Sequence, residues 1–152
     1  MSFNTKGLLT SNKQDWRTPT NIYYRFVKEY EFFDPCPANP EFDGLNIDWK
    51  ENNFVNPPYN KQSLWIDKAI KEMKRNKIIV LLIPARTDTK NFRKLYVNNA
   101  KFVFIQGRLK FSEGGAAPFP SMFVVLKKEY KEPSFLLMTK EDMEREFRWR
   151  IT

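Results

Sequence analysis

The stretch FVNPPYN at positions 54–60 ends an apolar segment on two consecutive prolines. Proline has no backbone N–H, so it removes a ladder hydrogen bond and is not tolerated inside a central strand. Phe54 and Val55 therefore predict a short buried strand, and residues 56–59 predict the start of the loop that follows it.

Helix and strand patterns alternate on both sides of this loop. Apolar residues at helical spacing predict helices over residues 21–31, 63–75, 89–99 and 140–150, with Ser63 as the N-cap of the second helix. Short apolar runs predict strands over residues 32–34, 54–55, 78–83, 102–105, 122–126 and 135–138. Such alternation is typical of parallel crossover units. The sequence therefore predicts a small α/β fold, with a mostly parallel central sheet flanked by helices.

The composition indicates one globular domain. The chain has 152 residues, of which 41% are hydrophobic and 29% charged. Its longest apolar run, residues 78–83, is far too short to span a membrane, and residues 1–14 lack the apolar core of a signal peptide. We expect residues 1–14 to form a flexible arm and residues 15–152 to form the domain, with no membrane attachment. A single cysteine, Cys36, excludes an internal disulfide and fits a cytoplasmic protein.

Charge is distributed unevenly along the chain. The formal net charge is +8, and residues 74–110 hold ten Lys or Arg and one acid. Residues 29–53 hold seven Asp or Glu and one base. A basic balance often indicates a polyanionic partner such as nucleic acid, although solubility alone also favours it. The pattern suggests one segment that attracts a cation and another that attracts a polyanion.

Several classes of active site are excluded by composition. The chain has no histidine, which removes Ser-His-Asp and Cys-His nucleophiles. With one cysteine and no histidine, it lacks the usual ligand set of a zinc site, so we expect no metal. No GxxxxGK[ST] loop is present to hold phosphates.

The loops after the predicted strands are the expected place for chemistry. In open α/β sheets, ligands bind beyond the carboxyl ends of the strands. Those ends carry three polar or proline-rich motifs: DPC at 34–36, NPPY at 56–59 and PAR at 84–86.

Six motifs in a fixed order give the chain a family resemblance. They are DWRTP at 15–19, FDPC at 33–36, NPPY at 56–59, PARTDT at 84–89, QGRLKF at 106–111 and APFPS at 117–121. The series resembles the phage-type, Dam-like DNA N6-adenine methyltransferases. NPPY alone is shared with methyltransferases that act on cytosine N4, on RNA or on protein glutamine, so the ordered series carries the resemblance. It implies a trimmed, Rossmann-like fold that uses S-adenosylmethionine to methylate adenine in DNA, in the cytoplasm of a bacterium or a phage-infected host.

The NPPY residues suit the methylation of an amino group. An exocyclic amine is a poor nucleophile because its lone pair is delocalised into the ring. The side-chain oxygen of Asn56 and the carbonyl of Pro57 can accept its two hydrogens, while Pro58 helps to fix the backbone. Tyr59 offers a ring face to a base that is flipped out of the helix. A plain proline-rich strand end with a buried tyrosine is the alternative.

The resemblance assigns the cofactor to the first two motifs. Thr18 and Pro19 resemble the N-terminal cofactor-binding motif, although, taken alone, a plain helix cap explains them better. Asp34 could receive the ammonium group of the cofactor, with Pro35 beside it and Cys36 as a small space-filler. The usual glycine-rich turn after this strand is missing.

Three further residues are weaker candidates for the cofactor site. Trp16 could line the adenine pocket, as could Trp49, although core packing explains both. Asp48 is the candidate for the ribose hydroxyls, because an acid after the next strand often takes that role. Asp43 and Glu51 are alternatives to Asp48.

Basic residues near the strand ends are candidates for DNA contacts. They are Arg86, Lys90, Arg93, Arg108 and Lys110. Lys90 and Arg93 also fit a solvated helix face. No segment between residues 60 and 121 is large enough for a separate recognition region, so the loop at 112–120, a homodimer or a partner protein would have to supply specificity.

Two alternatives to DNA N6-adenine methylation stay open. The first keeps the fold and acts on RNA or on cytosine N4. The second is a DNA-binding protein that kept the scaffold and lost catalysis.

Overall fold

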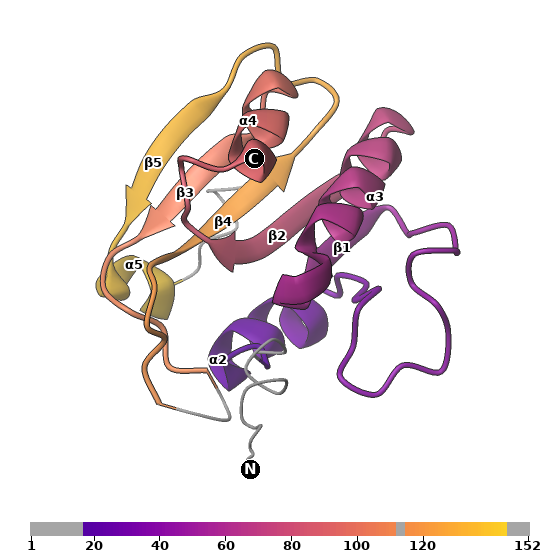
Figure 1. The fold of residues 1–152 in the computed structure, drawn as a ribbon. Coiled ribbons are helices and arrows are strands. Elements are labelled where there is room, and N and C mark those ends of the chain that lie inside the picture. The colour runs from indigo at the N-terminus through magenta and orange to yellow at the C-terminus, as the bar shows by residue number, and fades with distance from the viewer. Residues whose placement is uncertain (1–16, 112–114, 146–152) are drawn as a thin grey trace.

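The computed structural model describes residues 17–111 and 115–145. The predicted N-terminal arm, Trp16 and residues 146–150 of the last predicted helix lie outside this part of the chain. Figure 1 shows the described elements around one central sheet.

The sheet has five strands in the order β1-β2-β4-β3-β5. The strands are β1 (Asn52–Val55), β2 (Ile78–Pro84), β3 (Lys101–Ile105), β4 (Ser121–Leu126) and β5 (Ser134–Met138). β1 pairs in parallel with β2 and β3 with β5, whereas β4 is antiparallel to both of its neighbours. Four strands therefore point in one direction, as predicted, and the reversed β4 makes the sheet mixed.

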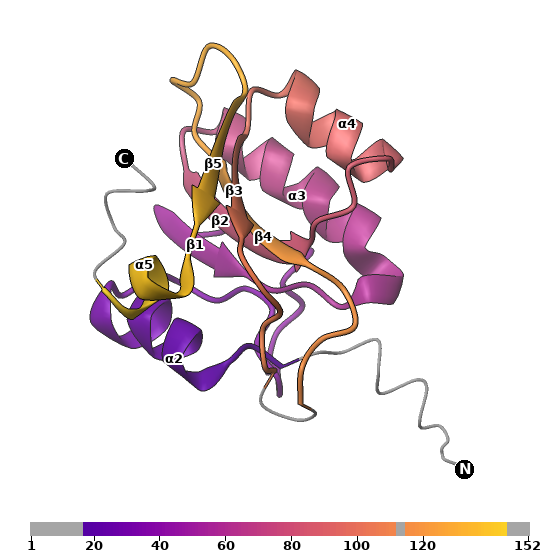
Figure 2. The same cartoon turned by 90° about the vertical axis from the view of Figure 1, so that its left-hand side faces the viewer.

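Helices cover both faces of the sheet. They are α2 (Thr20–Tyr23), continued by the π-helical turn η2 (Tyr24–Glu29), then α3 (Gln62–Lys74), α4 (Lys90–Val97) and α5 (Lys140–Glu144). Figure 2 shows α3 and α4 on one side of the sheet and α2 on the other. This arrangement confirms the predicted α/β class.

Alternating side chains of β2 divide the core into two layers. Val80 and Leu82 join the cluster under α2, where Phe26 stacks on Phe54 at 4.7 Å between ring centroids. Ile79 and its alternating neighbours join the cluster under α3 and α4. A strand buried on both faces reads as a continuous apolar run, which is why this strand could be predicted from the sequence.

Two local predictions differ from the structure. The predicted strand at residues 32–34 is reduced to one parallel bridge, in which Phe33 pairs with Asn53. The N-cap of α3 is Lys61 and not Ser63, because a 3₁₀ turn, η3 (Tyr59–Lys61), leads directly into the helix.

A buried ion cluster holds the amino-terminal edge of the sheet, between α3 and β2. The Glu72 carboxylate is fully buried and lies 2.6 Å from Lys77 Nζ and 2.8 Å from Lys68 Nζ. Burial alone would raise the pKa of Glu72, but hydrogen bonds from these two lysines outweigh it and lower the pKa to about 2. Arg75 lies 3.6 Å from Glu72 and 3.0 Å from Asp48. This edge is held by structural ion pairs.

Candidate functional site

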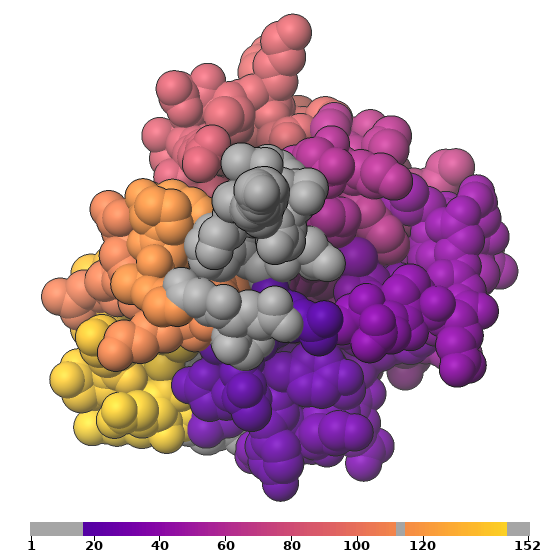
Figure 3. Space-filling view, turned by 60° about the horizontal axis from the view of Figure 1, so that its bottom comes forward, coloured from indigo at the N-terminus to yellow at the C-terminus, as the bar shows by residue number. Residues whose placement is uncertain are grey.

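The four forward strands end at one edge of the sheet, where their loops gather. β1 leads into Asn56, β2 into Arg86, β3 into Gln106 and β5 into Thr139. Figure 3 views this side of the molecule, with α2 in indigo, the segment after β3 in orange and α5 in yellow lying side by side. The predicted placement of the NPPY and PAR motifs beyond the strand ends agrees with this geometry.

A hydrogen bond joins the NPPY motif to the segment before α2. Asn56 Nδ2 donates to Thr18 Oγ1 at 3.0 Å, and Pro19 is the N-cap residue of α2 with no side-chain cap bond. Thr18 is therefore more than a helix cap, because its hydroxyl accepts from the motif. Since the amide is planar, the bond to Nδ2 turns Oδ1 of Asn56 away from Thr18.

The rest of the NPPY motif places an aromatic ring beside a cation. Pro57 is buried, and Pro58 has φ −64° and ψ 142°, an extended conformation. The Tyr59 ring meets Phe119 edge-on, with 5.2 Å between centroids, and Arg86 Cζ lies 5.8 Å from the Phe119 ring centroid. Burial raises the pKa of Tyr59, against a smaller opposing effect of the Arg86 charge, so the phenol stays neutral.

Asp34 is a half-buried carboxylate on the strand stub next to β1. Phe54 N donates to Phe33 O at 2.8 Å, which places Asp34 beside the end of β1. Cys36 N donates to Asp34 Oδ1 at 2.9 Å. Burial raises the pKa of Asp34 to about 6, although this hydrogen bond acts in the opposite direction. A carboxylate in such a partly desolvated place is suited to a cationic ligand.

The loop that follows Asp34 is folded back against it. Pro35 is buried, and a Cβ at Gly44 would overlap the Pro35 carbonyl oxygen, so only glycine fits at that point. Cys36 is half-buried in the same turn. The loop over residues 37–48 therefore packs against the end of the short strand segment at Phe33 and Asp34. This is the position of the glycine-rich turn that the sequence lacks.

Two of the three candidate acids for a ribose lie at the amino-terminal edge of the sheet, away from Asn56. Asp48 is 75% exposed and pairs with Arg75 at the amino-terminal edge, far from the loop after β1. Glu51 is exposed and immediately precedes β1, and Asp43 accepts from Leu45 N within its own loop. The geometry therefore gives no support to Asp48 or Glu51 as the ribose acid, whereas Asp43 adjoins Gly44, which packs on Pro35.

Trp49 is part of the core and not of a pocket. Its ring is buried and stacks on Trp65, with 6.3 Å between centroids, and its Nε1 donates to Gly44 O at 2.8 Å. Trp16, the other candidate for the adenine pocket, lies outside the described residues.

The predicted DNA-contacting residues fall into two groups. Arg86, Arg108 and Lys110 are exposed in loops at the same edge as Asn56. Lys90 and Arg93 are exposed on α4, which packs on the face of the sheet opposite α2. Lys90 stands between Thr89 and Asn91, which line a hollow beside Tyr59, so the first turn of α4 also borders the candidate site.

Sequence reasoning gave no role to two aromatic residues of the site. Phe119 lies in the APFPS motif and contacts both Tyr59 and Arg86. Burial raises the pKa of Tyr23, with a further contribution from the charge of Asp34, so α2 also approaches that carboxylate. The contacts of Phe119 join residues that are distant in the sequence, so its place in the APFPS motif was the only sequence signal for it.

A hollow of about 270 Å³ opens beside Tyr59, between the beginnings of α3 and α4. Its walls include Asn60, Arg86 and Phe92. Among residues 17–111 and 115–145, no group of three His, Cys, Asp or Glu side chains is placed to hold a metal ion, and no helix is long and apolar enough to cross a membrane.

Comparisons with known proteins place the chain in a family. A DNA N-6-adenine-methyltransferase of Escherichia phage T1 is 35% identical over 108 residues, covering 62% of this chain and 45% of the length of that relative. A solved structure from Listeria monocytogenes, assigned to the class I S-adenosylmethionine-dependent methyltransferases, aligns with a TM-score of 0.43 and 16% identity over 68% of this chain and 41% of its own. The family model described as DNA N-6-adenine-methyltransferase (Dam) matches residues 5–148. Because that match covers nearly the whole chain, the protein belongs to the Dam family of DNA N6-adenine methyltransferases.

Proposed function

We propose that this protein transfers a methyl group from S-adenosylmethionine to the N6 amino group of adenine in DNA. The observation that carries the proposal is the hydrogen bond between Asn56 and Thr18, which holds two family motifs together at the end of β1. Membership of the Dam family supports the substrate and the reaction. The chain spans less than half of the phage T1 relative, so the activity has to be tested on this chain itself.

Asn56 and Pro57 activate the adenine amino group. The Asn56 amide is oriented by Thr18, so its Oδ1 can accept one N6 hydrogen while the Pro57 carbonyl accepts the other. Two such acceptors favour the pyramidal amine, whose lone pair is available for attack. Preorganised polar groups of this kind are commonly worth about 3–4 kcal/mol each in the transition state. When the N–CH₃ bond forms, the amine would release one hydrogen as a proton to solvent, and the cofactor, having lost its S–CH₃ bond, would leave as a neutral thioether.

Tyr59 receives the base. The target adenine has to leave the stack before its amino group can reach Asn56. The Tyr59 ring packs against Phe119 at 71° between the ring planes and borders the hollow of about 270 Å³, which would give a flipped base access to the ring. Arg86 lies beside the same pair and places a positive charge where the flanking phosphates would lie.

Asp34 and its neighbours fit the cofactor. When bound, S-adenosylmethionine supplies an electrophilic methyl group on a sulfonium, together with an ammonium and a carboxylate. The half-buried Asp34 carboxylate fits the ammonium, and Pro35, Cys36, Thr18 and Pro19 would line the same end of the site.

A direct methylation assay tests the proposal. Purified protein is incubated with labelled S-adenosylmethionine and duplex DNA, single-stranded DNA or RNA in parallel, and digested nucleosides are identified by mass spectrometry. We expect N6-methyladenine from DNA and none from the Asn56→Ala variant. Label in N4-methylcytosine, label only in RNA, or no label with a folded protein that binds the cofactor would overturn the proposal.

The homodimer stays a prediction of the sequence. Analytical ultracentrifugation of the purified protein, with and without a DNA duplex, tests it.

A further inference from the structure

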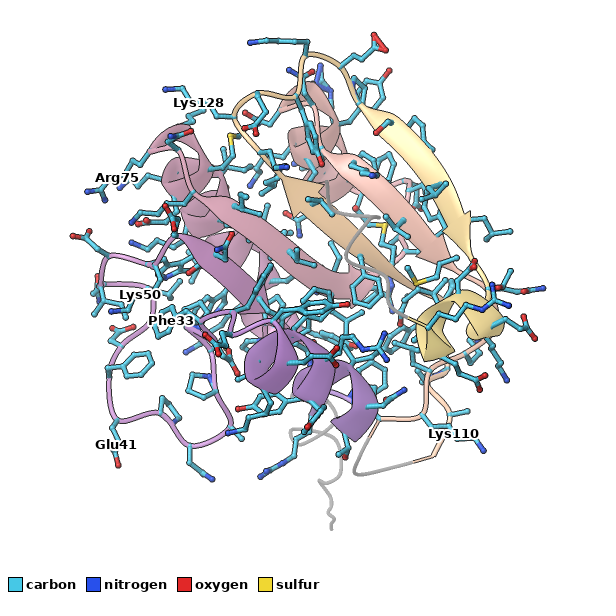
Figure 4. The ribbon with its side chains drawn as sticks, turned by 180° about the vertical axis from the view of Figure 1, so that it is seen from behind. Phe33, Glu41, Lys50, Arg75, Lys110 and Lys128 are labelled. Atoms are coloured by element: carbon cyan, nitrogen blue, oxygen red, sulfur yellow. The ribbon has the colours of Figure 1, made fainter. Side chains whose placement is uncertain are left out.

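The outer side of β5 is an open edge of the sheet. Among residues 17–111 and 115–145, β5 pairs with β3 alone, and Figures 1 and 4 show it as the outermost strand on its side of the molecule. Its five residues, SFLLM at 134–138, include no charged residue and no proline. Proteins usually protect such an edge with charges, prolines or a covering element, because its free backbone groups can pair with another strand. β5 is therefore a candidate for strand pairing.

Large apolar side chains of β5 are exposed beside this open edge. Phe135 is 53% exposed and Leu137 is 58% exposed. Phe135 stacks on Phe102 of the core, with 5.3 Å between ring centroids, and on the exposed Tyr96 of α4 at 6.4 Å. Because side chains alternate along a strand, Leu137 lies on the same face of the sheet as Phe135. The core layer under α4 thus continues to the open edge as an exposed apolar surface.

The backbone hydrogen bonds of β5 show which of its groups point outwards. Ser134 N donates to Ala100 O at 3.2 Å, towards β3. The direction of these groups alternates along a strand, so residues 134, 136 and 138 point theirs towards β3. Phe135 and Leu137 therefore point their N–H and C=O groups towards the open edge.

The free donors of the open edge end at both ends of β5. Pro133, before the strand, has no N–H. Thr139, after the strand, donates its N–H to Asp142 Oδ2 at 3.0 Å. Two N–H groups and their two carbonyls are therefore the outward backbone groups that a partner strand has to match.

We infer that β5 pairs with β5 of a second copy of this chain, antiparallel and about a two-fold axis at Leu136. In this register Phe135 faces Leu137 of the second copy, and the two residues exchange both of their N–H···O=C hydrogen bonds. All four outward backbone groups of each β5 are then paired, and Pro133 faces Thr139, where neither residue has a free donor to lose. A register shifted by one hydrogen-bonded pair would set a carbonyl of Phe135 or Leu137 against one of these two positions.

The side chains of β5 match in the same register. Residues directly opposite each other in an antiparallel pair lie on the same face, so Phe135 of each copy packs beside Leu137 of the other. Four exposed apolar side chains are thereby brought together on the face that carries α4. On the other face, the two Leu136 side chains meet at the axis, and each already packs on the core under α2.

Charged residues at the two ends of β5 identify a second copy as the partner. Lys131 and Glu132 precede the strand, and Lys140 and Glu141 follow it. All four are exposed, and none forms a salt bridge within the part of the chain that the structure describes. An axis at Leu136 brings Glu132 towards Lys140 of the second copy. The same symmetry brings Lys131 towards Glu141, so opposite charges meet at both ends.

The pairing would join two sheets into one continuous sheet. Because the two β5 strands are antiparallel, the carboxyl edges of the two sheets face in opposite directions, and so do the two Asn56 residues. Neither candidate site takes a residue from the other copy. The inference therefore stands independently of the proposed function.

Sedimentation of charge variants tests the open edge. A paired edge of this length is a small interface, so the wild type is measured by sedimentation velocity up to about 200 μM. We expect a reversible dimer for the wild type and a monomer for Leu137→Lys, which places a charge in the apolar contact. The matched control is Leu64→Lys: Leu64 is 55% exposed on α3, which Figure 1 shows on the β1 side of the sheet. It should dimerise as the wild type does.

Three results of this experiment would overturn the inference. They are a wild type that stays monomeric, a Leu137→Lys variant that dimerises like the wild type, and a Leu64→Lys variant that loses the dimer to the same extent. Thermal melts verify that each variant is folded, which both exposed positions allow.

A charge exchange tests the register. Glu132→Lys should weaken the dimer by up to about fivefold for each charge pair lost. Glu132→Lys combined with Lys140→Glu should restore the wild-type dissociation constant, because the pair is re-formed with its charges exchanged. A double variant as weak as Glu132→Lys alone would show that these two residues do not face each other.

A disulfide at the axis tests the register independently. The two Leu136 residues form a non-hydrogen-bonded pair with about 4.5 Å between Cα atoms, a distance that a disulfide spans. Leu136→Cys should therefore yield a covalent dimer under mild oxidation, seen by intact mass spectrometry. Ser134→Cys is the control, since the two Ser134 residues would lie four residues apart along the strands, about 13 Å. Equal cross-linking at both positions, or cross-linking of the wild type through Cys36, would contradict an axis at Leu136.

Discussion

The side-chain amide of Asn56 donates to the hydroxyl of Thr18 at 3.0 Å, joining two residues that lie 38 positions apart. The bond crosses from the end of β1 to the entrance of α2. A methyl transfer that depends on Oδ1 of Asn56 needs the amide in one orientation, and the Thr18 hydroxyl supplies the acceptor that selects it. Thr18 is therefore a positioning residue for Asn56.

Thr18→Val removes the hydroxyl and keeps the shape. A polar group left without its partner costs about 1–3 kcal/mol, so kcat should fall by roughly 5- to 150-fold. Cofactor affinity, measured by calorimetry, should change little, because the backbone of Thr18, through which it would line the cofactor site, is unchanged. Thr18→Ser keeps an acceptor and should recover most of the rate. If instead Thr18→Val weakens cofactor binding and leaves kcat intact, the hydroxyl contacts the cofactor and does not position Asn56.

Asn56→Ala should abolish transfer while cofactor affinity stays within about tenfold, because the lost acceptor acts mainly in the transition state. Single-turnover methylation and calorimetry measure the two effects separately. Wild-type activity in the Asn56→Ala variant would contradict the proposed mechanism.

Much of the fold could be predicted because its signals are local. β2 is a run of apolar residues stopped by Pro84, and helix α3 repeats apolar side chains at helical spacing. The direction of β4 could not be predicted. Its residues pair with β2 and β3, which are distant in the sequence, and a strand pattern carries no direction.

The candidate site was only partly predictable for the same reason. NPPY marks its own strand end, so the sequence located Asn56 and Tyr59. The assignment of Asp48 to the ribose assumes that an acid after the second strand lies in the cofactor site. In the structure, residues 37–48 form a loop instead, and Gly44 of that loop packs on Pro35. That loop leaves Asp48 at the other edge, paired with Arg75, as Figure 4 shows for Arg75 relative to Lys110.

Tyr59→Phe should retain most activity, since stacking uses the ring face and the ring contact with Phe119 survives. Tyr59→Ala should lose about 1–3 kcal/mol of base binding. The measurement is the fluorescence of a duplex with 2-aminopurine at the target position, together with KM for DNA. Equal damage from Phe and Ala would show that the hydroxyl matters and that the stacking role is wrong.

Glu72→Gln should destabilise the protein strongly without touching the site. Removing one partner from a buried ion pair costs about 3–5 kcal/mol, because Lys68 and Lys77 are left without their carboxylate. Asp67→Asn is the matched control, since Asp67 is 56% exposed and pairs with Lys94 at 2.6 Å. An exposed pair is worth at most about 1 kcal/mol. Urea unfolding at pH 7 measures both.

The pH dependence separates Glu72 from other causes of instability. Its folded pKa of about 2 lies below the ordinary value of 4.5, so its stabilisation is present above pH 4.5 and is lost as the pH falls towards 2. The difference between wild type and Glu72→Gln should shrink over that window. A difference independent of pH would mean that packing, and not the ion cluster, is responsible.

The contribution of Asp34 to stability changes with pH in the opposite direction to that of Glu72. Its folded pKa of about 6 lies above the ordinary value of 3.8, so its contribution to stability is present below pH 3.8 and is lost as the pH rises through 6. Asp34→Asn removes this titration and keeps an acceptor for Cys36 N. The variant should therefore be more stable than wild type above pH 6, by at most about 3 kcal/mol, and the two should converge near pH 4.

The same substitution should cost cofactor binding, because the proposed ammonium partner is lost. Urea unfolding between pH 4 and pH 8 measures stability, and calorimetry at pH 5 and pH 7.5 measures affinity for S-adenosylmethionine. Wild-type affinity should itself fall at pH 5, where Asp34 is mostly protonated. Asp48→Asn is the control, since Asp48 lies at the opposite edge, and it should bind the cofactor as wild type does. An Asp34→Asn variant that binds normally at pH 7.5, or a wild type with equal affinity at both pH values, would show that Asp34 does not hold the ammonium group.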